Sequence, residues 1–151
     1  MNGKALFFFC LGIVCLAGLL STTIFADQCK LVSLPSFDFG SLDPKYPSER
    51  TLEDYVTLWC AKDTEYTLSV NNGSNAVGSN PSLAKDGGGG KQILYSISFN
   101  KKGVGQGENV LIRVPVTIKI PAASQANLPV GRYGDQVKLT LDYSYKLEND
   151  I

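Results

Sequence analysis

The residues best suited to chemistry in this chain are carboxylates, because the sequence contains no histidine. The absence of histidine removes His-dependent triads, His-ligated zinc and the commonest general base at neutral pH. Glu53 and Asp54 form a carboxylate pair, but adjacent residues on a strand point to opposite faces and make a poor glycosidase dyad. Asp63, Glu65 and Asp86 lack the ligand spacing of a calcium loop. We therefore expect no enzymatic activity, no cofactor and no bound metal.

Two glycine-rich stretches bear a partial likeness to nucleotide-binding loops. Residues 87–90 are four glycines followed by Lys91, but Gln92 stands where a phosphate loop carries serine or threonine. Residues 103–107 lack the third spaced glycine of a dinucleotide-binding turn. Both stretches precede alternating, strand-like sequence, whereas both nucleotide loops open a helix. The sequence thus argues against phosphate and dinucleotide binding.

The first 26 residues have the composition of a secretory signal peptide. A basic start is followed by an apolar run, residues 5–20, and then by small residues that end at Ala26. The apolar run is about 16 residues long, shorter than the roughly 20 that a transmembrane anchor, the alternative, needs. We predict cleavage after Ala26, which leaves residues 27–151 as a single domain with no stable membrane span. Cys10 and Cys15 would be lost with the leader.

The predicted mature chain retains Cys29 and Cys60, and its charge is close to neutral. Loss of Lys4 leaves 13 basic residues against 14 acidic ones, a formal net charge of −1. Such a balance gives no electrostatic footprint for nucleic acid or anionic lipid. In an oxidising compartment the two cysteines are expected to form a disulfide, although two separate buried thiols are the alternative. The bond would close a loop of about 30 residues and contribute roughly 3–4 kcal/mol in the chain-entropy model.

A strict alternation near the C-terminus predicts the most prominent strand, residues 137–147. One face carries the apolar and aromatic residues Val137, Leu139, Leu141, Tyr143, Tyr145 and Leu147. Gly131, Tyr133 and Asp135 lie in the turn that leads into it. A strand with one apolar face needs neighbouring strands and a second layer that covers this face.

Similar alternation elsewhere predicts an all-β antiparallel sandwich. The other expected strands are residues 29–32, 37–39, 51–60, 66–70, 93–99 and 110–120. Pro115 cannot donate a backbone hydrogen bond, so the strand 110–120 must be an edge, bulged or interrupted at that point. Residues 74–91 are predicted to form a long flexible loop, residues 101–108 a turn, and residues 121–130 a connection without helical periodicity.

The order of these segments resembles the spore coat protein U domain, the subunit domain of archaic chaperone–usher pili. The resemblance covers essentially the whole predicted mature chain. Its landmarks are an early cysteine (Cys29), Phe-Asp-Phe-Gly (37–40), Val-Thr-Leu-Trp-Cys (56–60), Tyr-Thr-Leu-Ser-Val (66–70), Ile-Leu-Tyr-Ser-Ile (93–97), Val-Thr-Ile-Lys-Ile-Pro (116–121) and Gly-Arg-Tyr-Gly-Asp-Gln-Val-Lys-Leu-Thr-Leu-Asp-Tyr (131–143). The most specific part is the Gly-x-Tyr-x-Asp-x-Val run together with the two spaced cysteines.

This resemblance implies an immunoglobulin-like sandwich that lacks one strand, in a secreted structural or adhesive subunit. A periplasmic chaperone would fill the resulting groove first, and the N-terminal extension of another pilin subunit would replace it through an outer-membrane usher. The subunit would then reach the cell surface in a pilus or coat. Val137, Leu139, Leu141 and Tyr143 match the last strand of the family, which is expected to pair with the chaperone.

The N-terminal segment departs from the family pattern. Cleavage after Ala26 leaves two residues before Cys29, so the subunit would accept a strand without donating one. It would then sit at a tip, cap a fibre or not polymerise. Cleavage after Ala17 would leave residues 18–28, a marginal donor. The tail, residues 144–151, would either lengthen the last strand or fill the groove of its own chain.

A second class of function remains open, a self-complete secreted sandwich that binds a carbohydrate or a surface through residues 72–91. Asn72-Gly73-Ser74 fits a glycosylation acceptor, although a turn explains it as well. Tyr133, Tyr143 and Tyr145 could stack on a sugar, but their inward parity favours packing in the core or against a partner chain.

Overall fold

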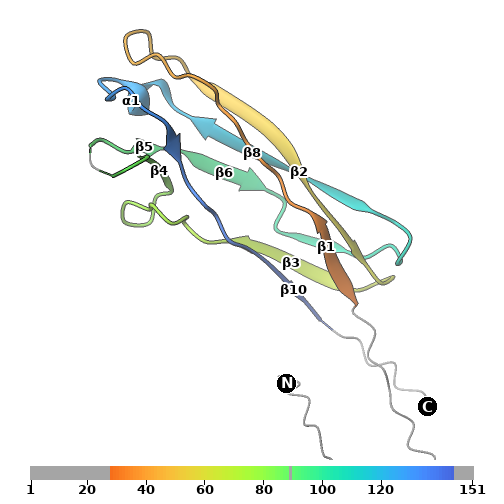
Figure 1. The fold of residues 1–151 in the computed structure, drawn as a ribbon. Coiled ribbons are helices and arrows are strands. Elements are labelled where there is room, and N and C mark those ends of the chain that lie inside the picture. Colours follow the sequence, from red (N-terminus) through yellow and green to blue (C-terminus); the bar gives the residue numbers. More distant parts are fainter. Residues whose placement is uncertain (1–27, 89, 145–151) are drawn as a thin grey trace, which may run out of the picture.

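The computed structural model describes residues 28–88 and 90–144, and these form a two-layered antiparallel β-sandwich. The elements, shown in Figure 1, are β1 (Cys29–Ser33), β2 (Arg50–Cys60), β3 (Glu65–Val70), β4 (Ser82–Lys85), β5 (Ile93–Leu94), β6 (Ser96–Phe99), β7 (Lys102–Val104), β8 (Ile112–Ile120), α1 (Ala122–Gln125), β9 (Tyr133–Gly134) and β10 (Leu139–Tyr143). The fold class predicted from the alternation is therefore confirmed.

The two layers are a four-stranded sheet in the order β1-β2-β8-β6 and a three-stranded sheet in the order β10-β3-β7. A third, small sheet in the order β5-β4-β9 joins the segments near one end of the sandwich. The long pair β2 and β8 sets the register of the first layer, with Val56 opposite Val114. In the second layer Leu139 of β10 lies opposite Val70 of β3.

The core is built from the alternate residues of these strands, as a side-chain period of two requires. Val56, Leu58 and Cys60 of β2 are fully buried, and they alternate with partly exposed neighbours. Leu68 of β3 is also fully buried and packs in the same cluster. Each such aliphatic side chain contributes about 1.5–3 kcal/mol through burial, so this cluster holds the two layers together.

Pro115 lies in the middle of β8, and the structure explains why it is tolerated there. On one side Pro115 is paired with Tyr55 of β2. On the other side β6 ends at Phe99, which pairs with Val116, so no strand of the described part continues alongside Pro115. Of the three alternatives that the sequence left open, β8 is a local edge at this residue.

Several boundaries differ from those expected from the sequence. The predicted loop 74–91 contains β4, and its Ser82 is fully buried because the strand pairs with both β5 and β9. The expected turn 101–108 contains β7, and the connection 121–130 contains the single helical turn α1. The strand 93–99 is divided into β5 and β6 at Tyr95. Short pairings of this kind depend on distant partners, which local alternation does not reveal.

Gly105 is expected to be sensitive to substitution, because its backbone lies against the end of β2. Its N–H donates to the Thr64 carbonyl at 2.7 Å, and a Cβ at this position would collide with the Ala61 carbonyl oxygen and with Cys60. The Gly105→Ala variant should lose about 2 kcal/mol of unfolding free energy, since backbone atoms cannot yield to an added methyl group. Urea unfolding checks this, with Gly134→Ala as the control because a Cβ there meets open space. Equal midpoints for the two variants would contradict the prediction.

Candidate docking groove

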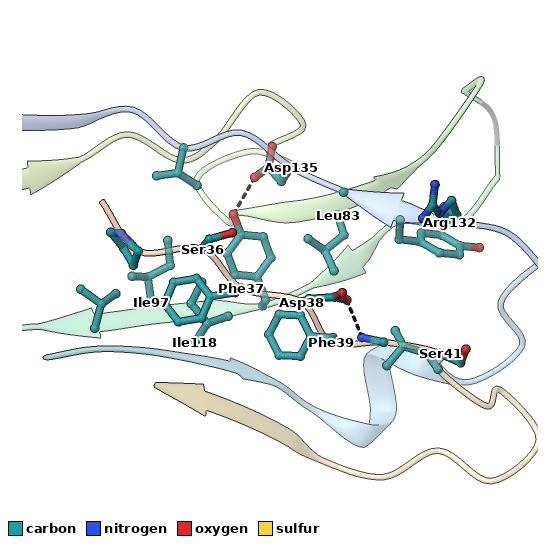
Figure 2. Close-up of a pocket in the computed structure, with 18 of the residues that line it drawn as sticks. Ser36, Phe37, Asp38, Phe39, Ser41, Leu83, Ile97, Ile118, Arg132 and Asp135 are labelled. Carbon is teal, nitrogen blue, oxygen red and sulfur yellow. Dashed lines mark hydrogen bonds between the residues drawn. The ribbon is translucent and has the colours of Figure 1, made fainter. Parts of the chain in front are cut away.

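A groove of about 760 Å³ opens along one side of the sandwich, between residues 34–42 and residues 128–139. Figure 2 shows Phe37 and Phe39 on one wall, with Ile97 and Ile118 beneath them and Asp135 on the far side. The floor is apolar, and both layers contribute to it: Val56, Ile97, Phe99, Val116 and Ile118 come from the first sheet, and Val70 and Leu139 from the second. The groove therefore reaches directly into the hydrophobic core.

The first wall is an extended segment, residues 34–42, that follows β1 without joining a sheet. Its side chains alternate, with Phe37 and Phe39 half-buried and Ser36 and Asp38 exposed. Phe37 packs against both hydrophobic clusters of the core. The expected strand 37–39 thus has the side-chain pattern of a strand but no partner strand in the described part of the chain.

Two carboxylates hold the backbone of this wall. Asp54 Oδ2 accepts a hydrogen bond from the Ser36 N–H at 2.9 Å, and its Oδ1 accepts one from the Tyr55 N–H at 2.8 Å. These two backbone donors, with a smaller contribution from the nearby Arg113 guanidinium, lower the pKa of Asp54. Asp38 Oδ1 accepts from the Gly40 N–H at 2.8 Å, where a φ of +63° turns the chain away.

The second wall includes Gly131, Tyr133 and Asp135, the residues predicted to shape the turn before the last strand. The Tyr133 hydroxyl donates to the Pro129 carbonyl at 2.6 Å. Asp135 Oδ2 accepts from the Tyr95 hydroxyl at 2.6 Å, a contact drawn in Figure 2, and Oδ1 accepts from the Ser74 N–H at 2.9 Å. Asp135 therefore ties this wall both to the core and to the loop that follows β3.

Tyr95 is the buried partner in this contact, with 6% of its surface exposed. Burial, reinforced by the hydrogen bond and the negative charge of Asp135, raises the pKa of Tyr95 far above its usual value. The hydroxyl accordingly stays protonated and donates to the carboxylate over the whole neutral range. The Tyr95 hydroxyl is thus a fixed structural donor that ties the second wall to the core.

The last strand lies at one edge of the groove, where Leu139 is among the residues that line it. β10 begins at Leu139, so the predicted strand start at Val137 is wrong, and Val137 lies before the strand with 36% of its surface exposed. Leu139, Leu141 and Tyr143 are half-buried and pack against the first core cluster. The sheet order places β10 at an edge, with β3 as its one neighbour in the described residues. An edge strand beside an open apolar floor is a template for another strand.

The disulfide between Cys29 and Cys60 is present, with an Sγ–Sγ distance of 2.01 Å. The two residues lie opposite each other where β1 pairs with β2. Both are buried, so the bond fixes the start of β1 against the core. It thereby also fixes the origin of the wall segment that continues from β1.

The structure does not bring the carboxylates considered for chemistry into one site. In residues 28–88 and 90–144, no group of three or more His, Cys, Asp and Glu side chains could hold a metal ion. Glu53 accepts a weak contact from the Tyr55 hydroxyl at 3.3 Å, whereas Asp54 faces Ser36. No helix in the described part is long and apolar enough to cross a membrane. The predicted leader, Tyr145 and the rest of the tail lie outside the described residues.

Sequence reasoning missed three contributors to the groove. The 34–42 segment was expected to be a short strand and a loop, Asp54 was considered as half of a carboxylate pair, and Leu128 was assigned to a connection. Leu128 is 7% exposed and packs with Tyr95 and Ile118 in the second core cluster. The Phe37-x-Phe39-Gly40 pattern is the sequence signal that could have indicated a covering segment, because two alternate aromatics require an apolar floor.

The fold is a pilin-like immunoglobulin sandwich, as comparison with solved structures shows. One match is a chain in the crystal structure of the CsuC–CsuE chaperone–tip adhesion subunit pre-assembly complex from the archaic chaperone–usher Csu pili of Acinetobacter baumannii. It has a TM-score of 0.51 and 20% identity over 76% of this chain and 38% of that chain, so the present chain spans less than two thirds of it. Another is the P pilus rod subunit PapA, with a TM-score of 0.51 and 16% identity over 78% of this chain and 99% of that chain.

The family follows from a match between residues 16–140 and the model of the Spore Coat Protein U domain. The matched region covers most of the chain, and the chain belongs to this family. The resemblance noted from the sequence is therefore confirmed. No match to a curated protein sequence was found.

Proposed function

We propose that this chain is a non-enzymatic subunit of a chaperone–usher pilus, and that its groove accepts an extended strand from a partner. The observation that carries the proposal is the opening of the core between two edges, the 34–42 segment and β10. Strand addition supplies backbone hydrogen bonds along such an edge, while alternate side chains enter the apolar floor. An open edge next to exposed core residues is otherwise an aggregation hazard, so the partner also protects the subunit.

The partners that fit this groove are a periplasmic chaperone and other pilin subunits, with an outer-membrane usher as the assembly site. Family membership and the pilin-like fold support this set of partners and a final position at the cell surface. The residues before Cys29 in the exported protein decide whether the subunit also donates a strand. Cleavage after Ala26 makes it an acceptor at a tip or cap, and cleavage after Ala17 gives it the donor segment 18–28.

Thermal unfolding of the protein recovered from an oxidising periplasm tests the proposal. We expect a low melting temperature for the isolated subunit and a rise of roughly 10 °C when a peptide of residues 18–28 is present at 100 times its Kd. A peptide with the same residues in scrambled order serves as the control, since it keeps the composition and loses the alternation. A cooperative, concentration-independent transition at an ordinary temperature, unchanged by either peptide, would instead indicate a self-complete binding module.

A further inference from the structure

We propose that Asp54 is a positioning residue that holds the backbone of Phe37 and Phe39 as a second pairing edge of the groove. This inference rests on the proposed function, because it concerns how a docked strand is bound. An incoming strand would then be hydrogen-bonded on both sides, to β10 and to the 34–42 segment. Nothing in the alternation of the sequence assigns such a role to Asp54.

The first step of the argument is the point at which β1 leaves its sheet. The pairing of β1 with β2 becomes irregular between Leu31 and Ser33 and ends where Ser33 lies opposite Thr57. Beyond this pair the backbone continues outside the sheet in an extended course (Figure 1), and residues 34–42 of this segment line the groove. Here the side chain of Asp54, three residues before Thr57 on β2, replaces the missing backbone partner and binds the Ser36 N–H at 2.9 Å.

The second step concerns the direction in which the remaining backbone groups point. In an extended chain, successive residues direct their N–H and C=O groups toward opposite edges. Because the Ser36 N–H points to Asp54 on β2, the backbone groups of Phe37 and Phe39 point to the other side, which is the groove. Neither residue forms a backbone-to-backbone hydrogen bond within the described part of the chain. Their rings remain anchored in the core below, as Figure 2 shows.

The third step identifies the matching groups on β10. The Ser144 N–H donates to the Glu65 carbonyl, and the Lys138 carbonyl accepts from the Asn71 N–H, so even-numbered residues pair toward β3. By the same alternation the N–H groups of Leu139 and Leu141 point to the outer edge of the sheet. The groove is thus bordered by two sets of backbone groups that face each other across an apolar floor.

Amide hydrogen exchange on the exported protein tests the inference directly, with the peptide of residues 18–28 as the probe. We expect the peptide to slow exchange at Leu139 and Leu141 and equally at Phe37 and Phe39. The Ser36 amide, which already has a carboxylate partner, should change little. Protection confined to Leu139 and Leu141 would overturn the inference while leaving the proposed function intact. A peptide that protects neither edge would overturn both.

The Asp54→Asn variant tests the role of the carboxylate. Asparagine offers one uncharged acceptor oxygen where the carboxylate offers two charged ones, so the hydrogen bonds to the Ser36 and Tyr55 N–H groups cannot both be kept and whichever remains is weakened, while the size of the side chain is unchanged. Peptide affinity should fall about tenfold, as expected for a lost hydrogen bond to a charged acceptor, and the protection of Phe37 and Phe39 should fall selectively. Glu53→Gln is the matched control, because Glu53 precedes Asp54 on β2 and has no contact with Ser36. Equal affinity and equal protection for the two variants would overturn the inference, as would a general loss of protection at both edges.

Discussion

Replacing Cys29 and Cys60 together by alanine is expected to lower the free energy of unfolding by roughly 3–4 kcal/mol. The bond joins residues that are 31 positions apart in the sequence, so its loss returns the closure entropy of that loop to the unfolded chain. Alanine is preferred to serine because both sulfur atoms lie in a buried environment, where a hydroxyl group would need a partner. For a marginally stable subunit this is a large part of the total stability.

The effect should extend beyond stability, because β1 is an edge strand that continues into the first wall of the groove. Without the bond, β1 is held by its pairing with β2 and by its apolar contacts alone. The double variant should therefore also bind the peptide of residues 18–28 more weakly, in proportion to the fraction of molecules in which this wall is detached.

Urea unfolding of the oxidised protein, the reduced protein and the double variant provides the measurement. Reduction of the wild-type bond should reproduce most of the loss, since it breaks the link but keeps both sulfur atoms in the core. The double variant should not respond to reductant. If the oxidised and reduced forms unfold at the same urea concentration, the entropic account of this bond is wrong.

The sequence was most informative where local alternation and local composition decide the outcome. Val56, Leu58 and Cys60 alternate on β2 because one face meets the core, and the same alternation is visible in the sequence. The disulfide was predicted from composition, because the predicted mature chain retains two cysteines. In the structure these two cysteines lie opposite each other on paired strands. These features depend on the period of the strand and on the compartment, and both can be read without knowledge of the partners.

The groove could not be predicted in the same way, because it is bordered by backbone segments that have no strand partner, among the described residues, on the side facing the groove. Phe37 and Phe39 alternate like strand residues, yet the pairing with β2 ends at Ser33, and beyond that point a side chain, Asp54, binds the Ser36 N–H. Ser82 reads as a loop residue, but β4 is stabilised by two distant strands at once. Such outcomes depend on register between remote segments, which a single sequence leaves undetermined.

Asp135 is the second residue whose loss should have a large effect, because its carboxylate accepts three hydrogen bonds from two separate segments. The Tyr95 hydroxyl, the Ser74 N–H and the Asn75 N–H all donate to its carboxylate, at 2.6, 2.9 and 3.1 Å respectively. The fit also depends on Gly73, where a Cβ would occupy the position of the carboxylate. Asp135→Ala is therefore expected to cost about 3 kcal/mol, since it removes the acceptor of the buried Tyr95 hydroxyl and of the Asn75 N–H, while the Ser74 N–H retains only its bond to the Gln136 carbonyl.

Asp135→Asn should recover most of this loss and remain within about 1 kcal/mol of the wild type. Its oxygen can still accept from the backbone amides, while its NH₂ group can donate to the Tyr95 hydroxyl, which is able to act as acceptor. Asp86→Ala is the control for removal of a carboxylate from an exposed turn and should change the stability by less than about 0.5 kcal/mol. Equal losses for the alanine and asparagine variants would show that shape and hydrogen bonding at Asp135 do not carry the effect.

The pH dependence of stability gives an independent test of the Tyr95 contact. The pKa of Tyr95 is raised in the folded protein, so this group contributes stability that is fully present below the unfolded pKa of about 10 and is lost as the pH rises further. The free energy of unfolding falls with rising pH because the unfolded chain releases the tyrosine proton first, while the native state retains it. Tyr95→Phe should reduce the alkaline loss, and Tyr66, whose pKa is also raised by burial, should account for part of what remains. If the free energy of unfolding of Tyr95→Phe falls with alkaline pH as steeply as that of the wild type, Tyr95 ionises in the folded state without destabilising it. The hydrogen bond between Asp135 and Tyr95 would then be weaker than its geometry indicates.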